Sequence, residues 1–116
     1  MEIEKFIEEN TAVDQAHLSD AVKLAESAAA LTGLLIEAIT KAGTDNGIDS
    51  EAEARKIAVQ AVFGSAKLIQ ESDEHPYALI DKVCSPAGTT IEGLLSLQKD
   101  GFEKKIIELT ETYLSR

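Results

Sequence analysis

Apolar residues recur along the chain at the three- and four-residue steps of an α-helix. The first long segment of this kind covers about residues 13–42, and Gly43 is expected to cap its C-terminal end. Residues 1–12 are mostly polar and predict a lead-in, so that residues 13–116 form one helical domain. The apolar positions on one face of the long segment are Leu18, Val22, Ala25, Ala29, Leu35 and Ile39.

A second helix has a clear start signal, because Ser50 and Glu53 have the spacing of a capping box. Gly64 lies inside this helix, where glycine costs about 1 kcal/mol relative to alanine. A close approach of another backbone is expected to offset that cost. The residues predicted to form the buried face are Ala54, Ile57, Ala61, Val62, Ser65, Leu68 and Ile69.

Three shorter helices follow. Pro76 suits the first turn of a helix that reaches residue 83. Thr89 and Glu92 form a second capping box, which opens a helix to about residue 99. Gly101 separates it from a last helix over residues 102–114, and no segment alternates with period two for long enough to predict a strand. The fold class is therefore all-α, a helical bundle.

Residues 28–39 (AAALTGLLIEAI) are apolar on nearly every side of the first long helix, with Glu37 as the only charge. A helix that is apolar all round is buried all round. At 1.5 Å per residue the whole helix is about 40 Å long. A compact domain of this size has a radius of gyration of about 13 Å, so the helix is as long as the domain is wide. The remaining four helices, three of them short, are not expected to enclose it alone, so a second copy of the chain is the simplest cover.

The chain is acidic, with a formal net charge of −10. Such a chain lacks the basic surface that binds DNA, RNA or anionic lipid, and it has no apolar run long enough to span a membrane. We therefore expect a cytoplasmic protein without nucleic acid or membrane partners. Cys84 is the only cysteine, which fits a reducing compartment.

Residues that could carry catalysis are few and scattered. His17 and His75 are the only histidines, and each is expected to be a surface or capping residue. Cys84 has no histidine near it in the sequence and is expected to be a structural thiol, and one cysteine cannot supply a zinc site. Neither a GxGxxG motif nor a P-loop occurs. The sequence therefore predicts no catalytic residue, no metal and no bound cofactor such as NAD(P)H.

The loop at residues 84–90 (CSPAGTT) leaves two interpretations open. The structural one is a turn followed by a helix N-cap. The functional one uses the same chemistry, because unpaired N–H groups and hydroxyls at a helix N-terminus can bind an anion such as a carboxylate.

From residue 47 to the end, the sequence resembles the C-terminal dimerisation domain of pyrroline-5-carboxylate reductase. The most specific stretch is EHPYALIDKVCSPAGTT (residues 74–90), and IEGLLSLQKDGF continues in register. The resemblance implies an interlocked helical homodimer related to proline biosynthesis. It also implies that the loop holds the substrate carboxylate, through the residues Ser85, Gly88, Thr89 and Thr90.

The sequence departs from the family pattern in three ways. Ala87 replaces the first glycine of the loop's glycine pair, and residues 26–32 (ESAAALT) replace a Ser-Gly-Ser-Gly-Pro-Ala-Tyr stretch. The nucleotide-binding domain is absent from these residues. A non-catalytic homodimerisation module is therefore the favoured interpretation. The alternatives are one half of a split reductase that needs a separate NAD(P)H-binding subunit, or a small carboxylate-binding dimer.

Overall fold

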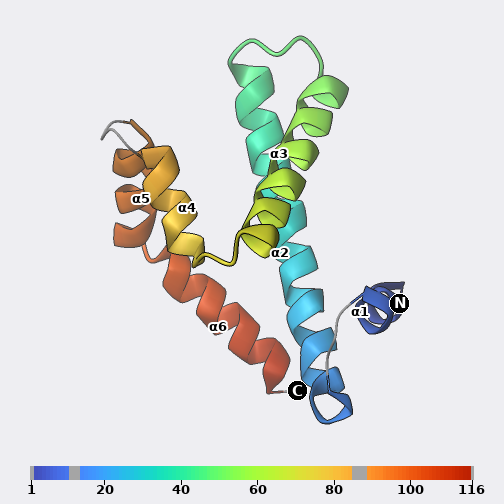
Figure 1. Cartoon of the computed structure of the whole chain (residues 1–116). Helices are drawn as coiled ribbons and strands as arrows, with labels where there is room; N and C mark the ends of the chain where they lie inside the picture. The colour runs from blue at the N-terminus through green and yellow to red at the C-terminus, as the bar shows by residue number, and fades with distance from the viewer. Residues whose placement is uncertain (1, 11–13, 85–88, 116) are drawn as a thin grey trace. The chain divides into compact units, whose positions relative to one another are not determined.

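The computed structural model describes residues 2–10, 14–84 and 89–115. Within these ranges every regular element is a helix and no strand occurs, which confirms the predicted all-α class (Figure 1). The elements are α1 (Glu2–Asn10), a 3-10 turn (Gln15–His17), α2 (Leu18–Asp45), α3 (Glu51–Ser72), α4 (Pro76–Cys84), α5 (Thr89–Lys99) and α6 (Phe102–Leu114).

The chain divides into two compact units. The first comprises Met1–Gly33 together with Phe102–Arg116, and the second is Leu34–Gly101. Helix α2 supplies its N-terminal part to the first unit and its C-terminal part to the second. Within the second unit, α3 returns alongside this part of α2 as a helical hairpin, and α4 packs on α5 (Figure 1). The features discussed below lie mainly in this second unit.

The end of α2 differs from the sequence prediction. Helix α2 continues through Gly43 to Asp45, and the residue with left-handed backbone is Gly47, whose φ is 116°. The N–H of Ile48 then donates to the carbonyl oxygen of Gly43 over 3.0 Å, which closes the turn in the manner of a Schellman motif. A Cβ at Gly43 would lie 2.9 Å from Cδ1 of Ile48, so a larger residue there would require the end of the Ile48 side chain to move.

Three other local signals are confirmed. The hydroxyl of Ser50 accepts a hydrogen bond from the Glu53 N–H over 3.1 Å and caps α3. Helix α3 ends at Ser72, its C-cap residue Asp73 takes the left-handed conformation, and Pro76 is the first residue of α4. Gly101, with φ of 81°, separates α5 from α6.

Small residues form the contact between α2 and α3. Ala54 and Ala58 are the buried apolar residues of the described chain, at 2% and 0% exposure. Thr40 on α2 is also buried, and its hydroxyl donates to the carbonyl oxygen of Ile36 over 2.7 Å. The side chains buried in the hairpin are therefore small, and the Thr40 hydroxyl is satisfied within its own helix.

The predicted buried face of α3 is partly wrong for a single chain. Ala54 is buried and Val62 and Ile69 are half-buried, as expected. The members that lie exposed are Ile57, Ala61, Ser65 and Leu68. On α2, Ala29, Leu35 and Ile39 of the predicted face are exposed as well. Periodicity identifies an apolar face, but it does not say which molecule covers that face.

Candidate dimer interface

The C-terminal part of α2 carries large apolar side chains on the side away from α3. Leu34 is 71% exposed, and Leu35 and Ile39 are also exposed. Leu35, Ala38 and Ala42 follow helical steps of three and four residues, which place them opposite the buried Thr40. The sequence predicted that one chain would not bury this apolar helix completely, and these exposed side chains agree with that prediction.

Helix α3 carries a comparable surface, which we call the α3 stripe: Ile57, Ala61, Gly64 and Leu68. Their spacing of four, three and four residues aligns them on one face, and all are exposed, with Ile57 at 49% and Leu68 at 53%. Phe63, at 62% exposure, lies on another side of the same helix.

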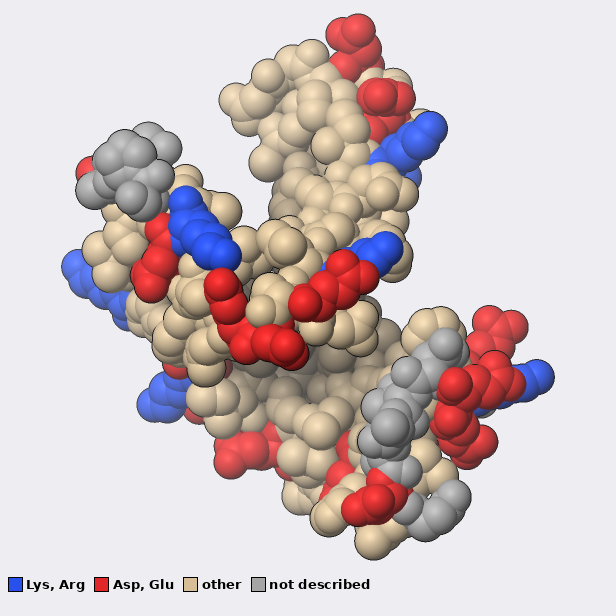
Figure 2. Space-filling model, in the orientation of Figure 1, with Lys and Arg blue, Asp and Glu red and all other residues tan. Residues whose placement is uncertain are grey.

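These exposures are large for a folded domain. Full burial of a Leu, Ile or Phe side chain is worth about 1.5–3 kcal/mol. Contiguous apolar surface on this scale is typical of an interaction site. In Figure 2 the hairpin of α2 and α3 presents a mostly uncharged surface, with charged side chains toward one edge and the tip. The second unit thus offers an apolar surface that its own chain leaves open.

A cluster of charged side chains links the two helices of the hairpin. The guanidinium of Arg55 on α3 makes a two-pronged ion pair with Glu37 on α2, in which Nη2 donates to Oε2 over 3.1 Å. Arg55 also donates to Glu51, one turn earlier on α3. The Arg55 hydrogen bonds lower the pKa of the Glu37 carboxyl, and those from Glu37 and Glu51 raise the pKa of Arg55. Glu37, the only charged residue in residues 28–39, is therefore paired with a residue of the same chain.

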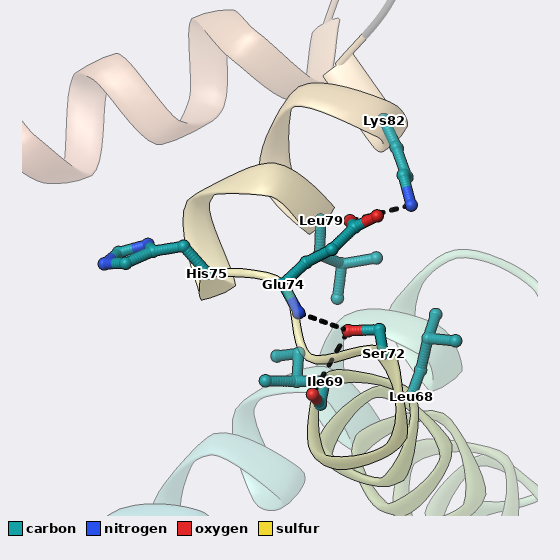
Figure 3. A pocket seen from close by; sticks show the side chains of 7 residues that line it. All are labelled: Leu68, Ile69, Ser72, Glu74, His75, Leu79 and Lys82. Carbon is teal, nitrogen blue, oxygen red and sulfur yellow. Dashed lines mark hydrogen bonds and ion pairs between the residues drawn. The ribbon is translucent and has the colours of Figure 1, made fainter.

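A small hollow lies where α3 meets α4 (Figure 3). Its apolar wall is formed by Leu68, Ile69 and Leu79. Across its rim, Lys82 forms an ion pair with Glu74 over 2.9 Å. The cavity volume is about 20 Å³, which is room for about one water molecule and not for a small organic acid.

The chemistry-bearing residues named above are dispersed. His75 is exposed, and its Nδ1 accepts from the Tyr77 N–H over 3.1 Å at the start of α4, which is the capping role expected for it. His17 ends the 3-10 turn and is exposed, and Cys84 is a half-buried free thiol at the end of α4. Among the residues that the structure describes, no group of histidine, cysteine and acidic residues could hold a metal ion.

The predicted carboxylate site falls largely on residues that the structure does not describe. Ser85 and Gly88 lie outside the described ranges, as does Ala87. Thr89 and Thr90 open helix α5, and Thr90 is exposed. The four residues therefore remain a prediction from the resemblance. In the described part of the chain, no helix is long and apolar enough to cross a bilayer.

An all-helical domain that leaves its large apolar side chains exposed is typical of a dimerisation domain. Comparison with known families agrees with this class. The model of the family described as pyrroline-5-carboxylate reductase dimerisation matches residues 15–116. The chain belongs to this family.

The chain is similar to part of several proteins named pyrroline-5-carboxylate reductase. The chain is 46% identical over 93 residues to the pyrroline-5-carboxylate reductase of Synechocystis sp., a match that covers 79% of this chain and 34% of the relative. It is 46% identical over 87 residues to the reductase of Escherichia coli, covering 75% and 32%. The chain therefore spans about a third of the length of these relatives, in their C-terminal part.

A solved structure supports the fold. The crystal structure of Plasmodium falciparum pyrroline carboxylate reductase with NADP bound matches 89% of this chain and 39% of that one. The TM-score is 0.75 at 27% sequence identity.

Proposed function

We propose that the chain is a homodimerisation module in which a second copy covers the apolar surface of α2 and α3. The observation that carries this proposal is that the hairpin buries small apolar side chains and leaves large ones exposed. Its buried apolar residues are two alanines, whereas Leu34, Ile57 and Leu68 are about half exposed or more. Membership of a dimerisation-domain family supports a second copy as the cover.

We also propose that these residues are non-catalytic by themselves. The 116 residues contain no GxGxxG motif to hold a dinucleotide. Hydride transfer would therefore require a nucleotide-binding domain outside them. The cytoplasm is the compartment proposed, because a single cysteine fits a reducing environment.

The dimer is tested by light scattering coupled to size exclusion over a range of protein concentrations. A Leu34→Lys variant places a charge on the most exposed leucine and is expected to shift the mass toward the monomer. The matched control is Gln98→Lys, which adds the same charge at an exposed position of α5. A wild-type chain that stays monomeric, or equal effects of the two substitutions, would refute the proposal.

A second candidate function is carboxylate binding, either as one half of a split reductase or as a small-ligand dimer. The observation that favours it is the Ser-Pro-Ala-Gly-Thr-Thr sequence of residues 85–90, which resembles the loop that holds the substrate carboxylate in the reductase. Calorimetric titration with proline tests it. Saturable binding that is lost in Thr89→Ala and in Gly88→Val would support it, whereas no heat at millimolar proline would exclude it.

A further inference from the structure

The turn between α2 and α3 places Asn46 directly before Gly47, at the tip of the hairpin (Figure 1). Each of the two residues meets a separate requirement of this turn. The backbone φ of Gly47 is 116°, a conformation that glycine adopts readily and side chains resist. The side-chain Nδ2 of Asn46 donates to the carbonyl oxygen of Ala42 over 2.8 Å, which satisfies one of the carbonyls that the last turn of a helix leaves unpaired. The turn therefore favours an Asn-Gly pair at this point.

An Asn-Gly pair is chemically labile, because glycine leaves the asparagine side chain open to attack by the next backbone nitrogen. The nitrogen of Gly47 loses its proton and bonds to Cγ of Asn46. The bond between Cγ and Nδ2 then breaks, so that ammonia leaves and a five-membered succinimide ring remains. Water opens this ring, and no oxidant or reductant takes part.

The ring opens to one of two products. Addition of water at Cγ breaks the new bond to nitrogen and gives aspartate. Addition at the backbone carbonyl of residue 46 gives isoaspartate, in which the main chain runs through Cβ and Cγ. Both products carry a carboxylate in place of the amide, so the chain gains a negative charge either way.

The pair is accessible to the water that the second step consumes. Asn46 and Gly47 are both exposed, and a Cβ added at Gly47 would meet no atom within 4 Å. The exposed turn therefore combines the labile pair with access to solvent.

We propose that Asn46 and Gly47 form a site of spontaneous deamidation, and that the reaction weakens the turn between α2 and α3. The hydrogen bond to Ala42 is lost because Nδ2 leaves as ammonia, and a carboxylate offers that carbonyl oxygen only a second acceptor. The new charge lies at the C-terminal end of α2, where the helix macrodipole disfavours an anion. It also joins Asp45 and Asp49, which are already negative.

Isoaspartate has a further effect on the turn. It adds a carbon to the main chain between residues 46 and 47. The N–H of Ile48, which donates to the carbonyl oxygen of Gly43 over 3.0 Å, would then no longer lie at the same distance along the chain. The hydrogen bond that closes the turn should therefore weaken as well.

Peptide mapping by mass spectrometry tests the reaction on the folded chain after days at mildly alkaline pH. The peptide that contains Asn46 should gain about one dalton and separate into aspartyl and isoaspartyl forms. The internal control is Asn10, the only other asparagine. It precedes Thr11, whose branched side chain hinders the same attack, so Asn46 should convert at least tenfold faster.

Asn46→Gln is the matched control variant, because its amide could close only a larger and less favoured ring and should remain intact. Conversion of Asn46 at the rate of Asn10 would overturn the inference. Conversion in urea but not in the folded chain would also overturn it, because the turn would then protect the pair.

Asn46→Asp reproduces the aspartate product and tests the effect on the turn. Urea unfolding at one fixed protein concentration should give a lower midpoint for this variant than for the wild type. The matched control is Gln98→Glu, which makes the same change from amide to carboxylate at an exposed position in the last turn of α5. It should lower the midpoint less, because the bond to Ala42 remains. An unchanged midpoint for Asn46→Asp, or equal shifts in the two variants, would contradict the proposed weakening.

Discussion

Along α3, the side that faces α2 carries alanines, whereas another side carries isoleucine and leucine. Ala54 and Ala58 are buried, and Ile57 and Leu68 are about half exposed. A single-chain protein usually buries its large aliphatic residues first. Within one chain, the hairpin therefore buries small residues and leaves large aliphatic residues exposed. This is the pattern expected if a second copy covers the large residues.

The largest effect is expected from a charge on the exposed side of α3. Ile57→Glu should weaken dimerisation by at least a hundredfold, or about 3 kcal/mol, because a carboxylate would be desolvated within the proposed interface. Sedimentation equilibrium measures the dissociation constant. Ala66→Glu, which adds the same charge at an exposed position on the opposite side of α3, is the control and should change it little. An equal increase of the dissociation constant in both variants would show that the two sides of α3 do not differ in their contribution to dimerisation.

The next largest effect is expected on the side that faces α2. Ala58→Leu adds three carbons where the exposed fraction is 0%. Overpacking of this kind should lower the free energy of unfolding by about 1–3 kcal/mol. Urea unfolding at one fixed protein concentration measures it, with Ala66→Leu as the exposed control on the same helix. A neutral Ala58→Leu would show that the two helices are not closely packed.

A smaller effect concerns the turn that joins the two helices. Gly47 has φ of 116°, a conformation that side chains resist, so Gly47→Ala should cost about 1–2 kcal/mol. Gly93→Ala should instead stabilise by up to about 1 kcal/mol, because Gly93 lies within a helix with open space around it. Thermal unfolding compares the two variants. Stabilisation by both would mean that the turn at Gly47 is not constrained.

The smallest effect is expected from the ion pair between the helices. Arg55 lowers the pKa of Glu37, so the pair stabilises the fold above the ordinary pKa of glutamate, and that contribution is lost as the pH falls through the lowered value. Glu37→Gln should therefore reduce the loss of stability on acidification below about pH 5. Added salt should reduce the difference between the variant and the wild type, because both side chains are exposed. An identical acid profile in both proteins would show that the pair contributes nothing.

Local signals made most helix boundaries predictable. Ser50 and Pro76 act through their immediate neighbours, so their positions in the sequence fix the starts of α3 and α4. Which of the two glycines, Gly43 or Gly47, ends helix α2 could not be predicted from immediate neighbours. It depends on which glycine lets the Ile48 N–H return to the last turn of α2, and that contact appears only once the chain has turned.

The interface was only partly predictable. The apolar excess of residues 28–39 indicated that one chain would leave this helix uncovered, and Leu34 and Leu35 are exposed as that excess implies. The predicted buried face of α3 included Ile57, which is about half exposed, and left out Ala58 beside it, which is buried. Helical periodicity does not distinguish an intramolecular neighbour from a second chain. The carboxylate loop rested on resemblance, and Ser85 and Gly88 lie outside the described residues.

If a second copy completes the packing of this chain, the unfolding midpoint must depend on protein concentration. When folding and dimerisation are coupled, each tenfold increase in concentration adds about 1.4 kcal/mol to the apparent stability of the dimer. We expect a urea midpoint that rises steadily between micromolar and hundred-micromolar protein. A midpoint that is the same at both ends of that range would contradict it, because the chain would then be stable without its second copy.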